Sequence, residues 1–357
     1  MKFWTLYILP LIFFACSGPD NPDYHPKASG KPGDMLIVMD SSQWKGDLGK
    51  EVRKVFAMPI PGMPQSEPMF NLVHLHPVRK TLLHQMRNVV YVFTLDQKTS
   101  GSILLRKKFT PQTIERIKSD TAFHLSTREN EFAKNQEVMY LFGNNEEQLI
   151  KYLRRQKQNI VDYFNKIERE RTVKDMPRGG SSPSAFLPRE LKFDMHVPLT
   201  YKLVERTSEF VWFRLIGPNS DRDIWVTWKP YVSEYQLMPD SLIDWRNQTL
   251  KKYIFEDPEK PASYLTTEQE DAKVHARQIK FNSHFSIELR GLWRTNTVTM
   301  GGPFLSYSLV DQGTNRLFMI EGFAYNPGKD KREMIRELEA ILWTFKTSTE
   351  LPQKQKK

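Results

Sequence analysis

The longest regular pattern in the 357-residue sequence is an amphipathic helix predicted from Glu146 to about Val173. The preceding run EVMYLFG has the composition of a buried strand, and Asn144-Asn145 between them supplies a helix N-cap. The apolar side chains of the helix recur at helical spacing on one face, at Leu149, Leu153, Ile160, Phe164 and Ile167. A helix of roughly 28 residues is about 42 Å long. We expect it to pack one face onto a sheet and to expose the rest.

The second half of the chain ends in the same order of elements. A strand is predicted from Arg316 to Tyr325, and Asn326 and Pro327 are expected to cap and open a helix. The apolar stripe of that helix consists of Ile335, Leu338, Ile341, Leu342 and Phe345. The repeated order favours two domains built on one plan.

Between the two halves, residues 174–188 (KDMPRGGSSPSAFLP) concentrate proline, glycine and serine and indicate a linker. We therefore predict an α+β fold with two tandem domains, 34–173 and 189–346, each an antiparallel-rich sheet covered by helices. Residues 347–357 are expected to form a basic, disordered tail.

The N-terminus carries an export signal. Phe3 to Phe14 is almost wholly apolar and too short for a spanning helix, which is typical of a signal peptide over residues 1–15. The only cysteine, Cys16, follows Ala15 directly. This junction resembles the lipobox of bacterial lipoproteins, although Phe13 and Phe14 replace the usual leucine and small residue. The resemblance implies a lipid on Cys16 and a flexible tether over residues 16–33; an incidental thiol is the alternative.

Charge is uneven along the chain, whose net charge is +10. Residues 1–180 carry 27 Lys and Arg against 19 Asp and Glu, whereas residues 181–357 carry 25 against 23. A basic half can attract nucleic acid, anionic lipid or acidic glycan. Export makes nucleic acid an unsuitable partner, so we expect none.

Candidate sites for chemistry are few. His74 and His76 in HLHP have strand spacing that places both imidazoles on one face, as in some zinc sites, but the third ligand is missing nearby. No G-x-S-x-G, HExxH or CxxC motif occurs, and GGS at 179–181 lacks the lysine of a phosphate loop. We predict no catalytic residue, metal or cofactor, with His74 and His76 as the only metal candidates.

An aromatic cluster offers a ligand-binding hypothesis. In IWVTWKPY, strand alternation points Trp225 and Trp228 to opposite faces, so one is exposed unless both faces of the sheet are covered. An exposed tryptophan beside Tyr231 could stack on a sugar ring or a peptide. Packing under helices is the alternative.

The closing segments GGPFLSYSLVDQ, IEGFAYNPGKDKR and IRELEAILWTF resemble an uncharacterised family of Bacteroidetes lipoproteins, domain-of-unknown-function family four-eight-three-seven, over nearly the whole chain. The resemblance implies a protein lipid-anchored at Cys16 in the outer membrane, facing the periplasm or the cell surface. It carries no catalytic residues. The second half also resembles the αβα sandwich of photosystem extrinsic proteins and Mog-one.

Two functions follow as expectations. The first is a lipid-anchored, non-enzymatic binding or structural module for an envelope protein or glycan. The second is a hydrolase or metal-dependent enzyme that acts on an envelope polymer.

Overall fold

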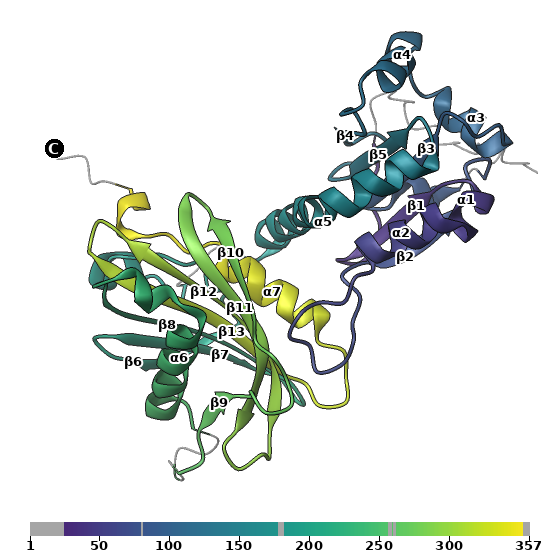
Figure 1. Ribbon diagram of the computed structural model, residues 1–357. Helices are drawn as coiled ribbons and strands as arrows, with labels where there is room; N and C mark the ends of the chain where they lie inside the picture. The colour runs from purple at the N-terminus through teal and green to yellow at the C-terminus, as the bar shows by residue number, and fades with distance from the viewer. Residues whose placement is uncertain (1–24, 80, 178–181, 256–258, 260–261, 353–357) are drawn as a thin grey trace, which may run out of the picture.

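The computed structural model describes residues 25–79, 81–177, 182–255, 259 and 262–352. Cys16 and the predicted signal peptide lie outside the described residues, as does part of the predicted linker. Figure 1 shows two lobes joined by one long helix, with each sheet in its own lobe. The α+β class and the two-domain layout are confirmed.

The first domain contains a five-stranded sheet of order β2-β1-β3-β5-β4. Its first four members in that order are paired in parallel, and only β4 is antiparallel. The strands are β1 (Asp34–Val38), β2 (Asn71–Leu75), β3 (Asn88–Thr94), β4 (Leu125–Glu129) and β5 (Glu137–Gly143). The antiparallel-rich sheet expected for this domain is therefore wrong.

Helices between the strands explain the parallel pairing. Parallel neighbours need a crossover, and both faces of such a sheet become covered, so its strands are continuously apolar. Every residue of β3 and β5 is buried, as their runs VVYVF and VMYLF imply. The helices are α1 (Ser41–Lys45), α2 (Asp47–Phe56), α3 (Ser100–Arg106) and α4 (Pro111–Ser119). Between β2 and β3, Leu82–Gln85 forms a short 3₁₀ helix.

The long helix α5 (Glu146–Asp175) starts as expected: the Gln148 backbone N–H donates to the Asn145 side chain at 2.9 Å. Its first part packs with α2 on the sheet of the first domain through residues from Leu149 to Phe164. Its last turns continue past that sheet and lie against α7 (Arg332–Leu342) of the second domain (Figure 1). α5 therefore contributes to the core of the first domain and to the interface with the second domain.

The second domain is built on an antiparallel sheet of order β10-β11-β12-β13-β8-β7-β6, with β9 paired to β11. Its strands are β6 (Lys202–Arg206), β7 (Phe210–Ile216), β8 (Asp221–Pro230), β9 (Leu265–Thr267), β10 (His275–Phe281), β11 (His284–Thr295), β12 (Gly301–Asp311) and β13 (Arg316–Tyr325). The helix α6 (Pro239–Tyr253) packs on one face and α7 (Arg332–Leu342) on the other. This arrangement matches the expected αβα sandwich.

The start of α7 differs from the prediction, because Asn326 and Pro327 precede it and Lys331 is its N-cap. The cap comes from the other domain. One carboxylate oxygen of Glu67 accepts the Lys331 N–H at 2.9 Å, and the other accepts the Arg332 N–H at 2.8 Å. A negative charge at a helix N-terminus is favourable, so this contact stabilises the helix and joins the domains at once.

The segment around Glu67 makes further contacts with the second domain. The Arg332 guanidinium donates to Asn71 Oδ1 at 2.7 Å, and Arg336 donates to the Met69 carbonyl. Gly62 has φ +73° and lies so close to the second domain that a Cβ would stand 2.5 Å from the Gly291 nitrogen. Sequence-local reasoning could not find this cap, since Glu67 and α7 are far apart in the chain.

The second domain also buries one carboxyl group with a raised pKa. Asp223 on β8 is 1% exposed and accepts a hydrogen bond from Trp212 Nε1 at 2.8 Å. Burial raises the pKa of Asp223 to about 7, although Arg214 and the Trp212 hydrogen bond act in the opposite direction. The folded protein therefore holds a proton there that the unfolded chain releases near pH 3.8.

This difference predicts a pH dependence of stability. Below pH about 4 the carboxyl is protonated in both states; as pH rises to about 7, only the unfolded state loses the proton, so stability falls by a few kcal/mol. We expect Asp223→Asn to abolish that fall and to raise the unfolding midpoint at pH 8. The measurement is thermal unfolding from pH 4 to pH 8, with the exposed Asp244→Asn as control. Equal pH slopes for wild type and Asp223→Asn would contradict the assignment.

Candidate functional site

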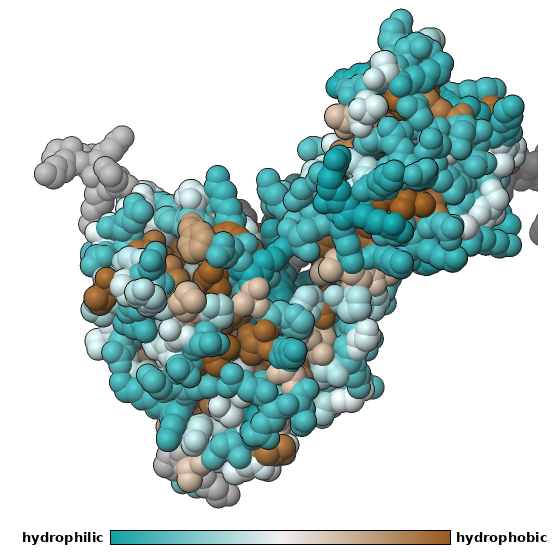
Figure 2. All heavy atoms as spheres, viewed as in Figure 1, coloured by the Kyte–Doolittle hydropathy of each residue, from teal (hydrophilic) through white to brown (hydrophobic). Residues whose placement is uncertain are grey.

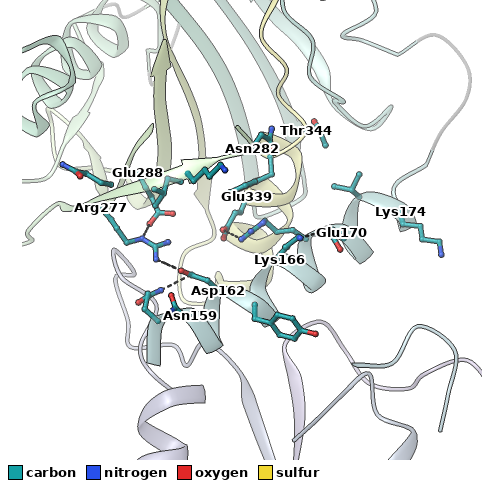
Figure 3. Close-up of a pocket in the computed structure, with 18 residues that line it drawn as sticks. Asn159, Asp162, Lys166, Glu170, Lys174, Arg277, Asn282, Glu288, Glu339 and Thr344 are labelled. Atoms are coloured by element: carbon teal, nitrogen blue, oxygen red, sulfur yellow. Dashed lines mark hydrogen bonds and ion pairs between the residues drawn. The ribbon is translucent and has the colours of Figure 1, made fainter. Parts of the chain in front are cut away.

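A groove of about 1040 Å³ lies between the two domains, with α5 on one side and β10 on the other. Figure 2 shows a notch between the two lobes, bordered mostly by hydrophilic residues. Figure 3 shows side chains of α5, such as Asp162, opposite Arg277 on the β10 strand. The volume is at the upper end of that of ligand sites in proteins.

A helix and a strand form the two long walls of the groove. Lining residues of α5 extend from Gln158 to Lys174, and those of β10 and its turn extend from Arg277 to Asn282. From Gln158 to Lys174 the helix rises about 24 Å. The strand from Arg277 to Asn282 covers about 17 Å. A helix and a strand thus bound a channel long enough for about five extended residues.

β10 is an edge strand of the sheet, paired with β11 alone among the described strands. A two-residue turn, Asn282-Ser283, joins the two strands, so Phe281 and His284 form a hydrogen-bonded pair. Hydrogen-bonded and non-bonded pairs alternate along an antiparallel ladder. The backbone N–H and C=O groups of Ala276, Gln278 and Lys280 therefore point away from β11, toward the unpaired edge.

The floor of the groove contains an alternating chain of six charges that crosses the domain boundary. In order, these are Asp162, Arg277, Glu288, Arg290, Glu339 and Arg169, joined by contacts of 3.0, 3.3, 3.2, 3.0 and 3.0 Å. The two end members belong to α5, and the others belong to the second domain. Each inner charge has an opposite charge on both sides, which offsets the cost of burying it.

The arginines fix the ionisation of the inner carboxylates. Burial alone would raise the pKa of Glu339, but Arg290 and Arg169 outweigh it and hold the pKa at about 2. Burial likewise opposes ionisation of Glu288, yet Arg290 and Arg277 keep its pKa below the ordinary value. Neither carboxylate can exchange a proton near neutral pH. The six paired charges therefore connect the two domains electrostatically rather than acting as an acid or base.

The outer part of the groove has a different charge balance. Lys166 lies 3.8 Å from Glu170, so both are paired. Lys174 and Lys280 are exposed and form no ion pair within the described part of the chain, and they lie on opposite walls. The groove thus presents two available positive charges to an occupant.

An apolar strip accompanies these charges. Val173, Ile279 and Trp343 line the groove and are partly buried. Trp343 is in contact with Arg169, whose guanidinium carbon is 4.1 Å from the ring centroid. The Trp343 indole nitrogen is buried and has no hydrogen-bond acceptor among the described residues. The groove therefore offers apolar area and cations together.

The predicted aromatic site is not formed. Trp225 and Trp228 do lie on opposite faces of the sheet, in the cores under α6 and α7 respectively. Both are buried, at 0% and 8% exposure. Of the two alternatives, the structure shows packing under helices, because helices cover both faces of the sheet. Tyr231 is half-buried, and its backbone N–H donates to the Asn315 carbonyl at 3.0 Å.

The two histidines of the metal hypothesis form hydrogen bonds within the first domain. His74 Nε2 is 3.0 Å from the Met39 carbonyl, and its ring stacks on Trp44 with centroids 4.7 Å apart. His76 Nε2 is 3.2 Å from Asp40 Oδ2. Within the described ranges, no three metal-ligating side chains of His, Cys, Asp or Glu gather at one point.

The groove was not predicted from the sequence, because strand β10 was not predicted. The run HARQIKF carries a signal for it: Ile279 and Phe281 alternate with polar residues, and Asn282-Ser283 is a turn pair. The opposite wall lies more than 100 residues earlier on α5, so its position depends on how the domains pack.

The fold and the groove define a two-domain α+β protein with a charged channel between the domains. Residues 28–177 match a domain of unknown function (DUF8532), and residues 182–344 match another domain of unknown function (DUF4837). Each of the two domains thus matches the model of one domain-of-unknown-function family. The expected family is thus confirmed for the second half, whereas the first half matches a different family model. No curated protein matches the chain.

Lipidation remains a prediction, as do the outer-membrane location and the link to Bacteroidetes. Among the helices of the described residues, none is long and apolar enough to span a bilayer.

Proposed function

We propose that the protein is a non-enzymatic, lipid-anchored binding module of the cell envelope, which holds an extended segment of a protein partner in the groove between α5 and β10. The observation that carries the proposal is the pairing of an open channel with an unpaired strand edge. Cys16 and the tether after it would keep this channel close to the membrane.

The contacts around the groove support a fixed channel rather than a closing cleft. Glu67 caps α7 from the first domain, and the six-charge chain joins α5 to β10, β11 and α7. Breaking the buried pairs of this chain, those of Glu339 with Arg169 and Arg290, is costly because it leaves uncompensated charge. A pre-formed site loses little conformational entropy on binding, which favours affinity for a flexible partner.

Binding is favoured over acid–base catalysis by the state of the carboxylates. An acid–base catalyst works best when its pKa is near the working pH. Glu339 is held ionised with a pKa of about 2, and Glu288 is also shifted downward. The groups at the centre of the groove therefore suit rigid electrostatic support. Turnover of an envelope polymer by the purified protein would favour the hydrolase or metal-dependent alternative.

Site-specific photo-cross-linking in cells tests the proposal. A photoreactive amino acid at Lys166 on α5 or at Lys280 on β10 should give the same protease-sensitive adduct from both walls. The control is Arg155, which is exposed on α5 but does not line the groove. Adducts from Arg155 as strong as those from the groove would contradict the proposal. An adduct that resists protease and is cleaved by glycan-degrading enzymes would show that the partner is a glycan and not a protein.

A further inference from the structure

We infer that the occupant of the groove is an extended, acidic peptide segment that adds to the β10 edge as a ninth strand of the sheet. The inference rests on the proposed function and specifies how the site would recognise its partner. Addition of a strand to an open edge supplies affinity through main-chain hydrogen bonds, and side-chain pockets supply specificity.

The backbone of β10 has the required groups. Ala276, Gln278 and Lys280 direct their N–H and C=O groups away from β11 by the register of the ladder. No side chain or backbone group of α5 bonds to these groups. A neighbouring strand lies about 4.8 Å away in a sheet. The groove provides that space along the edge, and its lining includes Arg277, Gln278, Ile279 and Lys280 in succession.

Side chains opposite β10 in the groove would contact the side chains of the added strand. Successive residues of a strand point to opposite faces, so alternate side chains of the peptide would meet Val173 and Trp343 in the apolar strip.

Charge complementarity indicates an acidic partner. The carboxylates of the groove already have cationic partners at Arg277, Arg290, Arg169 and Lys166. Lys174 and Lys280 have none within the described residues, and both lie at the groove. An aspartate or glutamate of the peptide close to either lysine would form an ion pair, with a gain that falls at high salt.

Two other occupants are disfavoured by the same charges. A second copy pairing through β10 would bring His275, Arg277 and Lys280 of both chains together, and like charges across a ladder are unfavourable. The C-terminal tail of the chain carries Lys354, Lys356 and Lys357, so its charge has the same sign as the available lysines.

The experiment is a selection from a phage-displayed library of random dodecapeptides on the full chain, followed by affinity measurements with the selected peptides. We expect enriched peptides to contain Asp or Glu. We expect Gln278→Pro, which removes one outward N–H from an edge strand, to weaken binding at least about tenfold. The matched control is Val204→Pro on β6, the opposite edge strand, where a bulge leaves Val204 out of the pairing register.

A second measurement does not depend on whether the variant folds. Peptides N-methylated at alternate residues should lose binding to the wild-type chain in one register and keep it in the other, because only every second residue of an added strand bonds to β10. Equal effects of Gln278→Pro and Val204→Pro, or equal effects of both methylation registers, would overturn strand addition. Binding of soluble glycan fragments in place of peptides would also overturn it, while leaving the groove as a binding site.

Discussion

Replacing Cys16 by alanine should move the protein almost completely from the membrane fraction to the soluble fraction. Each methylene of a buried acyl chain contributes roughly 0.8 kcal/mol, and two or three chains hold a protein durably where one holds it marginally. The alanine variant has no thiol to acylate, so all of this anchoring free energy is lost. The measurement is fractionation of cells with immunodetection, together with metabolic labelling by a fatty acid.

The matched control for this variant is Ser17→Ala, which changes the neighbouring residue and leaves the thiol in place. We expect it to stay in the membrane fraction and to carry label. A Cys16→Ala protein that remains in the membrane fraction would show that another feature anchors the chain.

The second large effect concerns the buried pair between α6 and the sheet. Arg246 Nε and Nη2 donate to the two carboxylate oxygens of Glu321, both at 2.7 Å, and neither side chain is exposed to solvent. Arg246 Nη1 also donates to Thr267 at 2.7 Å. The guanidinium carbon lies 3.7 Å from the centroid of the Phe304 ring. This arginine therefore has all its main partners inside the core.

We expect Arg246→Met to lower the free energy of unfolding by about 3–5 kcal/mol, because the glutamate loses its partner in a dry site. Replacement of both partners by apolar residues is much less harmful than removal of one. Arg246→Met with Glu321→Leu should therefore recover most of the lost stability. The measurement is chemical denaturation, monitored by tryptophan fluorescence.

An exposed pair provides the comparison. Lys252 and Glu209 are also in contact, at 2.5 Å, but their side chains are 60% and 50% exposed. Lys252→Met should leave the unfolding midpoint nearly unchanged, since exposed pairs contribute little. A similar small change for Arg246→Met would contradict the importance of the buried pair, and so would a double variant less stable than Arg246→Met alone.

Local patterns in the sequence predicted many of the elements. The strand from Arg316 to Tyr325 has the expected bounds, and α5 begins at Glu146 under its Asn145 cap as expected. These features depend on residues within one or two turns of each other, so the sequence alone shows them.

The incorrect predictions concern features of the fold that are determined by tertiary contacts. The cap of α7 comes from Glu67 in the other domain, so local residues such as Asn326 gave the wrong start. The parallel pairing in the first sheet follows from crossover helices, although continuous apolar strands such as β3 were a signal for it. Trp225 is buried because α6 covers its face, which alternation along one strand cannot reveal.

The candidate site could not be predicted from the sequence for a similar reason. Its walls are α5 of the first domain and β10 of the second, and only the packing of the domains brings Asp162 within 3.0 Å of Arg277. Ion pairs at this distance between remote segments leave no periodic trace in one sequence. Of the residues that the sequence did single out, Trp228 lies in the core of the second domain, and His74 stacks on Trp44 in the first domain.

Residue-resolved amide hydrogen exchange of the full chain, with and without a saturating selected peptide, tests the central claim most directly. In the peptide-free protein, the amides of Gln278 and Lys280 should exchange quickly, whereas those of Arg277 and Ile279 should be protected by bonds to β11. On binding, exchange at Gln278 and Lys280 should slow at least about tenfold, with little change at the alternate positions. Unchanged exchange at both amides under saturating peptide would contradict strand addition at β10.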